Sequence, residues 1–542
     1  MQRTTLLLFY LLAAWADASK VEHLLISSEI YTRFAETLVE SFVENTEAHP
    51  EEVLFRAVLP EDAYISNFTL EIENEITVGE VKEKNQASTI FTDAVTKGLS
   101  AGLVERRDTN QFEIRVAMAP HAKVTFALTY QEVLKREHGV YKHVVNVQTQ
   151  EEVDLVQVDV YIANRSPISR IHVPEFAPRI AEKSNDALLN LPEATEVDVD
   201  QSDPSGRTAT ISFLPLATGQ GVNGQLVVLY DVERGTNGGE IQVVNGYFVH
   251  FFAPARVERG TKHVVFVLDK SGSMNGRKFH QLREAMGAIL EDLDPNDHFN
   301  VLLFSSDVQN WRPESAPATD DNIESARAFV DGSAPKGGTN MVAAMDAALE
   351  LLRSDRSNKL VSMMIVLTDG QPTEGETDPD VIVNAMNSKN QDGFSIHGLA
   401  FGADADYKLL RRLAADNDGL ARYVYEDADA PQQLEGFYNL IATPLLRNVN
   451  IRYVRGNVDR TSLVEDHDIY YDGTEVVTVG KSADASNRVV AIVSAKSQSR
   501  RSRKFVARSE DAQGHCFQRP AKQSLQPRTI PICGRPAPGA YP

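Results

Sequence analysis

From Lys262 to about residue 445, short apolar runs alternate with longer stretches of helical spacing. The first run, residues 264–268, reads Val-Val-Phe-Val-Leu, which is typical of a parallel strand buried on both faces. Apolar residues then recur every three to four positions over 279–293, which predicts a helix. The alternation continues through four further segments: 299–304, 341–352, 363–367 and 395–401. It predicts a doubly wound α/β sheet, Rossmann-like in architecture and mostly parallel.

The segments on either side of this unit are rich in β-branched and aromatic residues, as strands are. Because the chain has 542 residues, several domains are expected. The predicted fold class is therefore multidomain, with β-rich parts flanking one α/β domain. The predicted divisions are a signal peptide (1–18), a first β domain (19–150), a β-rich connecting segment (151–261), the α/β domain (262–445), a β-rich segment that packs with 151–261 (446–495) and a basic tail (496–542).

The first 18 residues have the pattern of a secretory signal peptide. Arg3 precedes the apolar run 6–15, and Ala16-Asp17-Ala18 matches a cleavage site with Ser19 as the new start. No later stretch has 18 consecutive apolar residues, so no membrane span is predicted. We therefore expect a secreted, extracellular protein.

Charge is distributed unevenly along the chain. The net charge of -22 argues against nucleic acid as a partner. From Lys496 onward, however, ten Lys and Arg face only two acidic residues. This tail suggests either a solvated arm or a contact for a polyanion such as a glycosaminoglycan; the densest candidate cluster is Arg500, Arg501, Arg503 and Lys504.

The tail also contains both cysteines of the chain, Cys516 and Cys533. In an oxidising compartment they are candidates for a disulfide that closes one small loop. Pairing with another chain is the alternative, and the sequence does not decide between the two. Asn67 and Asn164 each begin an N-glycosylation sequon, although Pro167 directly follows the second.

Oxygen-bearing side chains follow the predicted strands of the α/β unit. The strand 264–268 runs into Asp269, and the strand 363–367 runs into Thr368-Asp369-Gly370. Ligand sites in parallel sheets lie beyond the carboxyl ends of the strands. The candidate ligands are two carboxylates and three hydroxyls: Asp269, Ser271, Ser273, Thr339 and Asp369. Because they include no His or Cys, they select Mg²⁺, with Ca²⁺ or Mn²⁺ as alternatives, rather than zinc.

Two carboxylates are enough to neutralise a divalent ion, and one coordination position would remain open toward solvent. A carboxylate from a partner could fill that position. No base or nucleophile follows in the neighbouring sequence, so the pattern favours binding over catalysis. We expect Lys270 and Asn275, on the same loop, to meet the partner.

These motifs resemble the metal-ion-dependent adhesion site of von Willebrand factor type A domains. The resemblance covers D-x-S-x-S at 269–273, Gly-Gly-Thr at 337–339 and T-D-G at 368–370. It implies that the five residues named above ligate the ion.

The first β domain resembles the VIT domain of inter-alpha-trypsin inhibitor heavy chains. The similarity lies in four segments: Ile65–Phe68 after Pro60, Gly79–Lys84, Gly98–Val104 and Lys123–Phe126. The resemblance implies an extracellular protein ligand with an exposed Asp or Glu. It also implies association with hyaluronan-rich matrix, a Kunitz-type inhibitor light chain as partner, and a family link to protease inhibition.

The chain departs from that family at one motif. Family precursors are cleaved at Asp-Pro-His, where an ester to a chondroitin sulfate chain then forms. Here Asp-Pro occurs at 203–204, 294–295 and 378–379, never followed by His. The metal site is therefore carried over and the covalent glycosaminoglycan link is not.

Three hypotheses for function follow. The first is a non-enzymatic adhesion protein that grips an acidic group through a divalent cation. The second is a structural matrix component that binds polyanions through its basic tail, the metal being only structural. The third is an enzyme: Gly98–Gly102 fits the G-x-S-x-G elbow around Ser100. The elbow needs a strand before it, however, and a helix is predicted there, over 84–97. His138 and His143 lack zinc-site spacing and are expected to be surface residues.

Overall fold

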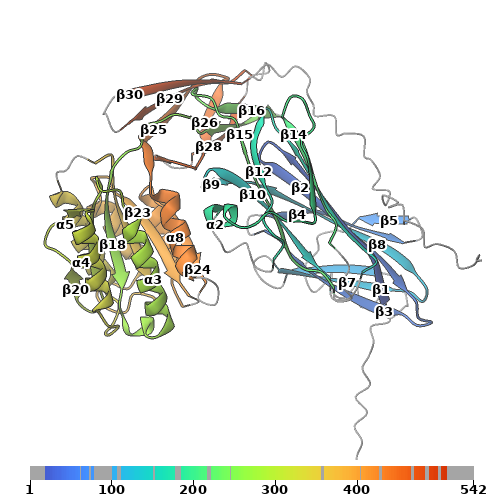
Figure 1. Cartoon of the computed structure of the whole chain (residues 1–542), viewed down its shortest axis with the longest axis horizontal. Helices are drawn as coiled ribbons and strands as arrows, with labels where there is room; N and C mark the ends of the chain where they lie inside the picture. Colours follow the sequence, from blue (N-terminus) through green and yellow to red (C-terminus); the bar gives the residue numbers. More distant parts are fainter. Residues whose placement is uncertain are drawn as a thin grey trace, which may run out of the picture.

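Figure 1 shows the computed structural model, in which an α/β domain and two β units can be followed by colour. The structure describes residues 19–509 except for 61–62, 73–74, 79–100, 107–110, 150–152, 178–184, 216–220, 245, 356–358, 403, 426–429, 466–468, 483–487 and 498–501. The predicted signal peptide, the helix expected over 84–97, the Ser100 segment, Arg500, Arg501, Cys516 and Cys533 lie outside the described residues. Among the described helices, none is long and apolar enough to cross a membrane.

The α/β domain is built on one sheet with the order β20-β19-β18-β22-β23-β24, and β21 pairs with β19. Its strands are β18 (Lys262–Asp269), β19 (His298–Phe304), β20 (Val308–Asn310), β21 (Ala316–Pro317), β22 (Val361–Thr368), β23 (Ser395–Phe401) and β24 (Ala421–Val424). The pairs β18–β19, β18–β22, β22–β23 and β23–β24 are parallel. The predicted doubly wound fold is therefore confirmed.

Helices cover both faces of this sheet because apolar side chains point alternately to either side of each strand. One core joins Val264 and Phe266 to α3, α4 and α8, and the other joins Val265 and Val267 to α5, α6 and α7. The helices are η2 (Gly272–Met274), α3 (Arg277–Glu291), α4 (Asp320–Asp331), α5 (Met341–Ser354), α6 (Pro379–Lys389), α7 (Tyr407–Asp416) and α8 (Ala430–Ile441).

The first β unit is a sandwich. An eight-stranded sheet, β13-β14-β11-β1-β2-β8-β4-β5, packs against a four-stranded sheet, β12-β15-β10-β9. A third sheet, β3-β7-β6, adds to one end of the core. The elements are β1 (Ser19–Tyr31), β2 (Phe34–Asn45), β3 (Glu51–Val58), β4 (Tyr64–Ile72), β5 (Glu75–Val78), β6 (Ala101–Arg106), β7 (Gln111–Met118), β8 (Lys123–Val133), β9 (Arg136–Glu137), β10 (Val140–Gln148), β11 (Leu155–Ala163), β12 (Ile168–His172), α2 (Asn185–Leu189), β13 (Val197–Asp200), β14 (Thr208–Phe213) and β15 (Asn223–Val232).

The second β unit combines segments from before and after the α/β domain. The sheets β16-β17-β28-β26 and β27-β25-β29-β30 enclose one core, which includes Phe252 and Phe505. The strands are β16 (Glu240–Val244), β17 (Tyr247–Phe252), β25 (Pro444–Arg455), β26 (Val458–Glu465), β27 (Tyr470–Tyr471), β28 (Val476–Ser482), β29 (Val490–Lys496) and β30 (Ser502–Arg508). The α/β domain is thus inserted between β17 and β25. In Figure 1, β25 (orange) leads from this domain to β29 and β30.

Two predicted boundaries differ from the structure. The division at residue 150 cuts through one sandwich, because β11 pairs in parallel with β1. The tail predicted from residue 496 contains β30, which pairs with β29 along its whole length.

Candidate functional site

The candidate metal site lies where β18 and β22 end. β18 finishes at Asp269 and β22 at Thr368, and α5 begins just after Thr339 with Asn340 as its cap. The backbone N–H of Gly272 donates to the carbonyl of Gly337 at 3.0 Å, which joins the first two loops. Gly337 has a φ of +82°, a conformation that side chains disfavour. The three predicted loops therefore meet at one rim of the sheet.

The five predicted ligand residues lie together at this rim. The N–H of Ser271 donates to Asp269 Oδ1 at 2.7 Å, and the hydroxyls of Ser271 and Ser273 are 3.0 Å apart. The Ser273 hydroxyl donates to Asp369 Oδ1 at 2.7 Å. A Cβ placed on Gly370 would lie 3.7 Å from Ser273 Oγ and 3.9 Å from Thr339 Oγ1. The loops thus bring hydroxyls and carboxylates within reach of one small ion.

Two further side chains, which sequence reasoning missed, hold the two carboxylates. The Thr368 hydroxyl donates to Asp269 Oδ2 at 2.6 Å, and the Lys278 ammonium lies 2.9 Å from Asp369 Oδ2. Thr368 lies inside the T-D-G motif, so the motif could have identified it as a residue that supports the site. Lys278 comes from the first turn of α3, and no motif pointed to it.

Burial governs the electrostatics of the rim. Asp269 and Asp369 are both 0% exposed. Loss of hydration raises the pKa of Asp269 to about 6, against the hydrogen bonds from Thr368 and Ser271, which lower it. The negative charge of Asp369 raises it further. A cation at the rim would relieve this unfavourable burial of negative charge.

The donor set fits a hard divalent cation. All five residues offer oxygen, and Mg²⁺ and Ca²⁺ prefer oxygen ligands. Within the described residues, no group of three or more His, Cys, Asp or Glu is placed to hold a metal, so hydroxyls would have to complete this shell. When bound, such an ion would supply an electrophilic position for an acidic ligand.

The two residues of the first loop that we expected to contact a partner differ in their exposure. Asn275 is exposed, as a residue that meets a partner must be. Lys270 is 2% exposed, and its ammonium lies 3.7 Å from Asp307 Oδ1. The prediction that Lys270 contacts a partner is therefore wrong, because the side chain turns under the rim rather than out from it.

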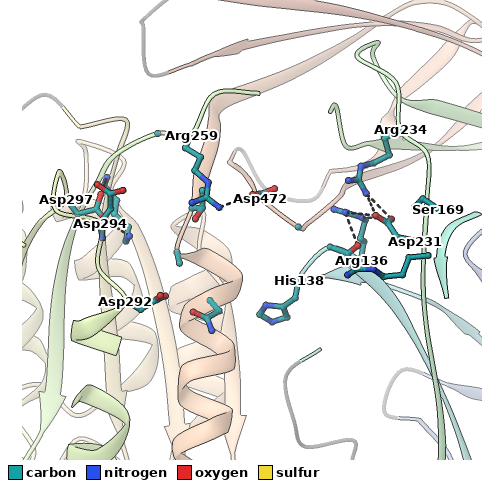
Figure 2. A pocket seen from close by; sticks show the side chains of 18 residues that line it. Arg136, His138, Ser169, Asp231, Arg234, Arg259, Asp292, Asp294, Asp297 and Asp472 are labelled. Atoms are coloured by element: carbon teal, nitrogen blue, oxygen red, sulfur yellow. Dashed lines mark hydrogen bonds and ion pairs between the residues drawn. The ribbon is translucent and has the colours of Figure 1, made fainter. Parts of the chain in front are cut away.

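A cleft of about 830 Å³ lies at the opposite, amino end of the sheet (Figure 2). Its α/β wall carries Asp292, Asp294 and Asp297, and its β wall carries Arg136, Arg234 and Asp231. Asp231 accepts from both guanidiniums, and Asp297 pairs with the Lys262 ammonium. Because most of these charges are matched within the protein, the cleft gives less reason than the rim to expect an added ion.

The other predicted site residues are scattered. Asn67 is exposed on β4, where a glycan could attach. Asn164 is 5% exposed with its amide nitrogen buried, so this packing leaves no room for a glycan there.

Arg503 and Lys504 belong to β30, the edge strand of its sheet, rather than to an arm. Basic residues on an edge also have a structural use, since they oppose unwanted strand pairing.

His143 is fully buried, so its predicted surface position is wrong. Its Nδ1 lies 2.8 Å from Glu132 Oε1 and its Nε2 lies 3.0 Å from Ser28 Oγ, which also contacts Thr37 Oγ1 at 2.8 Å. Ser, His and Glu in this order resemble a hydrolase triad. Ser28 is 0% exposed, however, so no substrate could reach it in this fold. The network satisfies polar groups inside the sandwich.

The rim and the sheet beneath it define a von Willebrand factor type A domain. The sequence profile of that domain matches residues 263–439, and the profile of the vault protein inter-alpha-trypsin domain matches residues 21–130. Together with identities of 39% and 35% to two curated heavy chains over 87% of this chain, these profiles place the chain in the inter-alpha-trypsin inhibitor heavy chain family.

Curated relatives match across both domains. The chain is 39% identical over 490 residues to inter-alpha-trypsin inhibitor heavy chain H4 of Homo sapiens, which covers 87% of this chain and 51% of the relative. It is 35% identical over 493 residues to heavy chain H2 of Homo sapiens, covering 87% and 50%. It is 36% identical over 488 residues to heavy chain H3 of Mus musculus, covering 86% and 53%. The chain thus spans about half the length of these relatives.

Among solved structures, the fold is similar to a von Willebrand factor type A protein from Catenulispora acidiphila. The TM-score is 0.40 at 14% identity, and the match covers 64% of this chain and 76% of the other.

Proposed function

We propose that this chain is a non-enzymatic extracellular binding protein whose type A domain captures an acidic group of a partner through a divalent cation. The observation that carries the proposal is the convergence of two fully buried carboxylates and three hydroxyls at one rim. Asp269 and Asp369 would anchor the ion, and Ser271, Ser273 and Thr339 would complete its shell. Mg²⁺ is the proposed ion, since the ligands are all oxygen.

The hydrogen bonds at the rim support this assignment of roles. Asp269 is oriented by Thr368 and by the backbone of Ser271, so its position is fixed before any ion arrives. Such outer partners commonly matter for metal affinity by about 10–100-fold. The site is thus preorganised, which reduces the cost of ordering it on binding.

The test is capture of partners from extracellular fluid by the immobilised chain, with and without a chelator. Wild type should retain a set of proteins that the chelator releases, and Asp269→Ala should retain none of that set. Asp294→Asn is the matched control, because it removes one negative charge at the other end of the sheet. Capture that survives both the chelator and Asp269→Ala would show that the rim does not carry the binding.

The identity of the partner is a further part of the proposal. The relatives are named as heavy chains of a trypsin inhibitor, so an inhibitor light chain of the Kunitz type is one candidate. Hyaluronan-rich matrix is another, through the family resemblance. Secretion, with removal of residues 1–18, and a glycan on the exposed Asn67 belong to the same proposal.

The second candidate is polyanion binding through basic residues near the C-terminus. Its supporting observation is that Lys504 and Arg508 are exposed along β30. A salt titration against heparin distinguishes polyanion binding from capture through the metal site. It compares wild type with the Lys504→Gln, Arg508→Gln double variant. Chelator-resistant binding that weakens with salt and with this variant would favour the polyanion, since exposed charges are screened by salt.

A further inference from the structure

Lys278 places a fixed positive charge inside the rim. Its ammonium lies 2.9 Å from Asp369 Oδ2, and its side chain is only 14% exposed. The other oxygen of Asp369 accepts from Ser273. One side chain outside the five predicted ligands therefore contacts a carboxylate that the ion would use.

The surrounding turn reinforces this positive charge. Lys278 is the second residue of α3, whose first turn contains no acidic residue. The first turn of a helix usually favours acidic side chains, because the exposed N–H groups there carry partial positive charge. Here Arg277 and Lys278 occupy it instead, so the protein accepts an unfavourable local arrangement at this place.

The charge of the loaded site follows from these groups. A divalent ion is neutralised by Asp269 and Asp369, and Lys278 then leaves the site with one net positive charge. A single carboxylate ligand would bring the site to neutrality. Without Lys278 the loaded site would already be neutral, and the same ligand would make it negative in a partly dry environment, which is costly.

We propose that Lys278 sets the preference of the loaded site for an anionic ligand and, in doing so, weakens the binding of the ion itself. This inference rests on the proposed metal-dependent function. It assigns opposite effects to one side chain: repulsion of the cation and attraction of the acidic ligand. If Lys278 only held Asp369 in place, its removal would shift the affinity for the cation and the affinity for the acidic ligand in the same direction.

The experiment uses the full chain and Mn²⁺ as the probe. The affinity for Mn²⁺ is measured by the relaxation of water protons, and occupation of the open position by the relaxation of acetate methyl protons at saturating Mn²⁺. For Lys278→Met we expect about tenfold tighter Mn²⁺ binding and about tenfold weaker acetate binding, as one unit charge acting over a few ångströms would cause.

Three controls accompany this variant. Lys278→Arg retains the charge and should leave both affinities within about twofold of wild type, well below the effect of a lost charge. Arg277→Met removes an equal charge from the neighbouring exposed residue and should change both much less. Lys278→Gln removes the charge but retains a hydrogen-bond donor, so it serves where Lys278→Met does not fold.

The outcomes separate this inference from the function beneath it. If the wild-type chain binds no Mn²⁺, both the proposed metal-dependent function and the role of Lys278 are overturned. If wild type binds Mn²⁺ and acetate but the uncharged variants match it, or shift both affinities in the same direction, the proposed function stands and the role of Lys278 is overturned. Opposite shifts in the two affinities support it.

Discussion

The two ends of the α/β sheet differ in how their buried carboxylates are compensated. At the amino end, Asp297 accepts from the backbone N–H of Lys262 at 2.8 Å and pairs with its ammonium, and both side chains are nearly inaccessible. At the carboxyl end, the buried Asp269 receives hydrogen bonds from neutral groups, and its pKa is raised to about 6. Burial alone therefore does not identify a binding site. What identifies it is acidity that the protein leaves incompletely compensated.

The largest expected contrast comes from removing one carboxylate at each end. Asp297→Ala leaves the Lys262 ammonium buried and unpaired, which should lower the free energy of unfolding by about 3–5 kcal/mol. Asp269→Asn in metal-free protein removes a charge that burial disfavours and should cost less than about 1 kcal/mol. Chemical denaturation measures both. Equal losses would mean that the two ends do not differ as described.

A third region, the second β unit, contains a buried histidine whose hydrogen-bond partners among the described residues are neutral. The Nε2–H of His250, on β17, donates to the Gly238 carbonyl at 2.7 Å, and its Nδ1 lies 3.2 Å from the Tyr453 hydroxyl. Burial lowers the pKa of His250 to about 4. As the pH falls below about 6.5, the unfolded chain takes up the proton first. Between pH 6.5 and 4 this residue should therefore reduce stability by up to about 3 kcal/mol.

Denaturation at several pH values checks this. The contribution should be fully present above pH 6.5, and His250→Gln should flatten that part of the pH profile. An unchanged slope in His250→Gln would place the acid sensitivity elsewhere.

Addition of Mg²⁺ tests the carboxyl end directly. At a free concentration of about 100 times the dissociation constant, the ion should stabilise the fold by about 2.7 kcal/mol, because it binds only the native state. Calorimetry with Mg²⁺ or with chelator measures the shift. Asp369→Asn should abolish it and Asp294→Asn should preserve it; the reverse pattern would move the site to the cleft.

The smallest effect is expected where the α/β domain contacts the first β unit at the surface. Arg422 Nη2 lies 3.4 Å from Glu137 Oε2, and both side chains are about one-third exposed. Water screens such a pair, so Arg422→Ala should cost less than about 1 kcal/mol. A loss comparable to that of Asp297→Ala would show that this exposed contact contributes as much to stability as the buried ion pair does.

Much of the α/β domain could be predicted because its signals are local. The strands expected at 264–268 and 363–367 correspond to β18 and β22, which extend them by one to two residues at each end. The five candidate ligands follow strand ends or open a helix, and parallel strands bring such positions to one edge. Lys278 could not be found in this way, since its contact with Asp369 spans 91 residues and follows no motif.

The β regions were less predictable for the same physical reason. Alternation marks a strand but does not name its partner, and register is set by distant segments. Arg33 illustrates this: its guanidinium contacts Glu475, 442 residues away, and lies in the same buried cluster as Glu240 and Tyr141. The burial of His143 and Asn164 depends equally on neighbours that no local pattern reveals.

From the sequence alone came the α/β class of the inserted domain and the prediction of five oxygen ligands for a hard cation, because periodicity and donor chemistry are properties of short segments. Which charges are compensated depends on the packing of distant segments and could be read only from the folded chain. Lys262 neutralises Asp297 within the protein, whereas the rim brings two carboxylates together with a single lysine against one of them. Electrostatic energy depends on distance and burial, and both are fixed only when segments far apart in the chain have packed together.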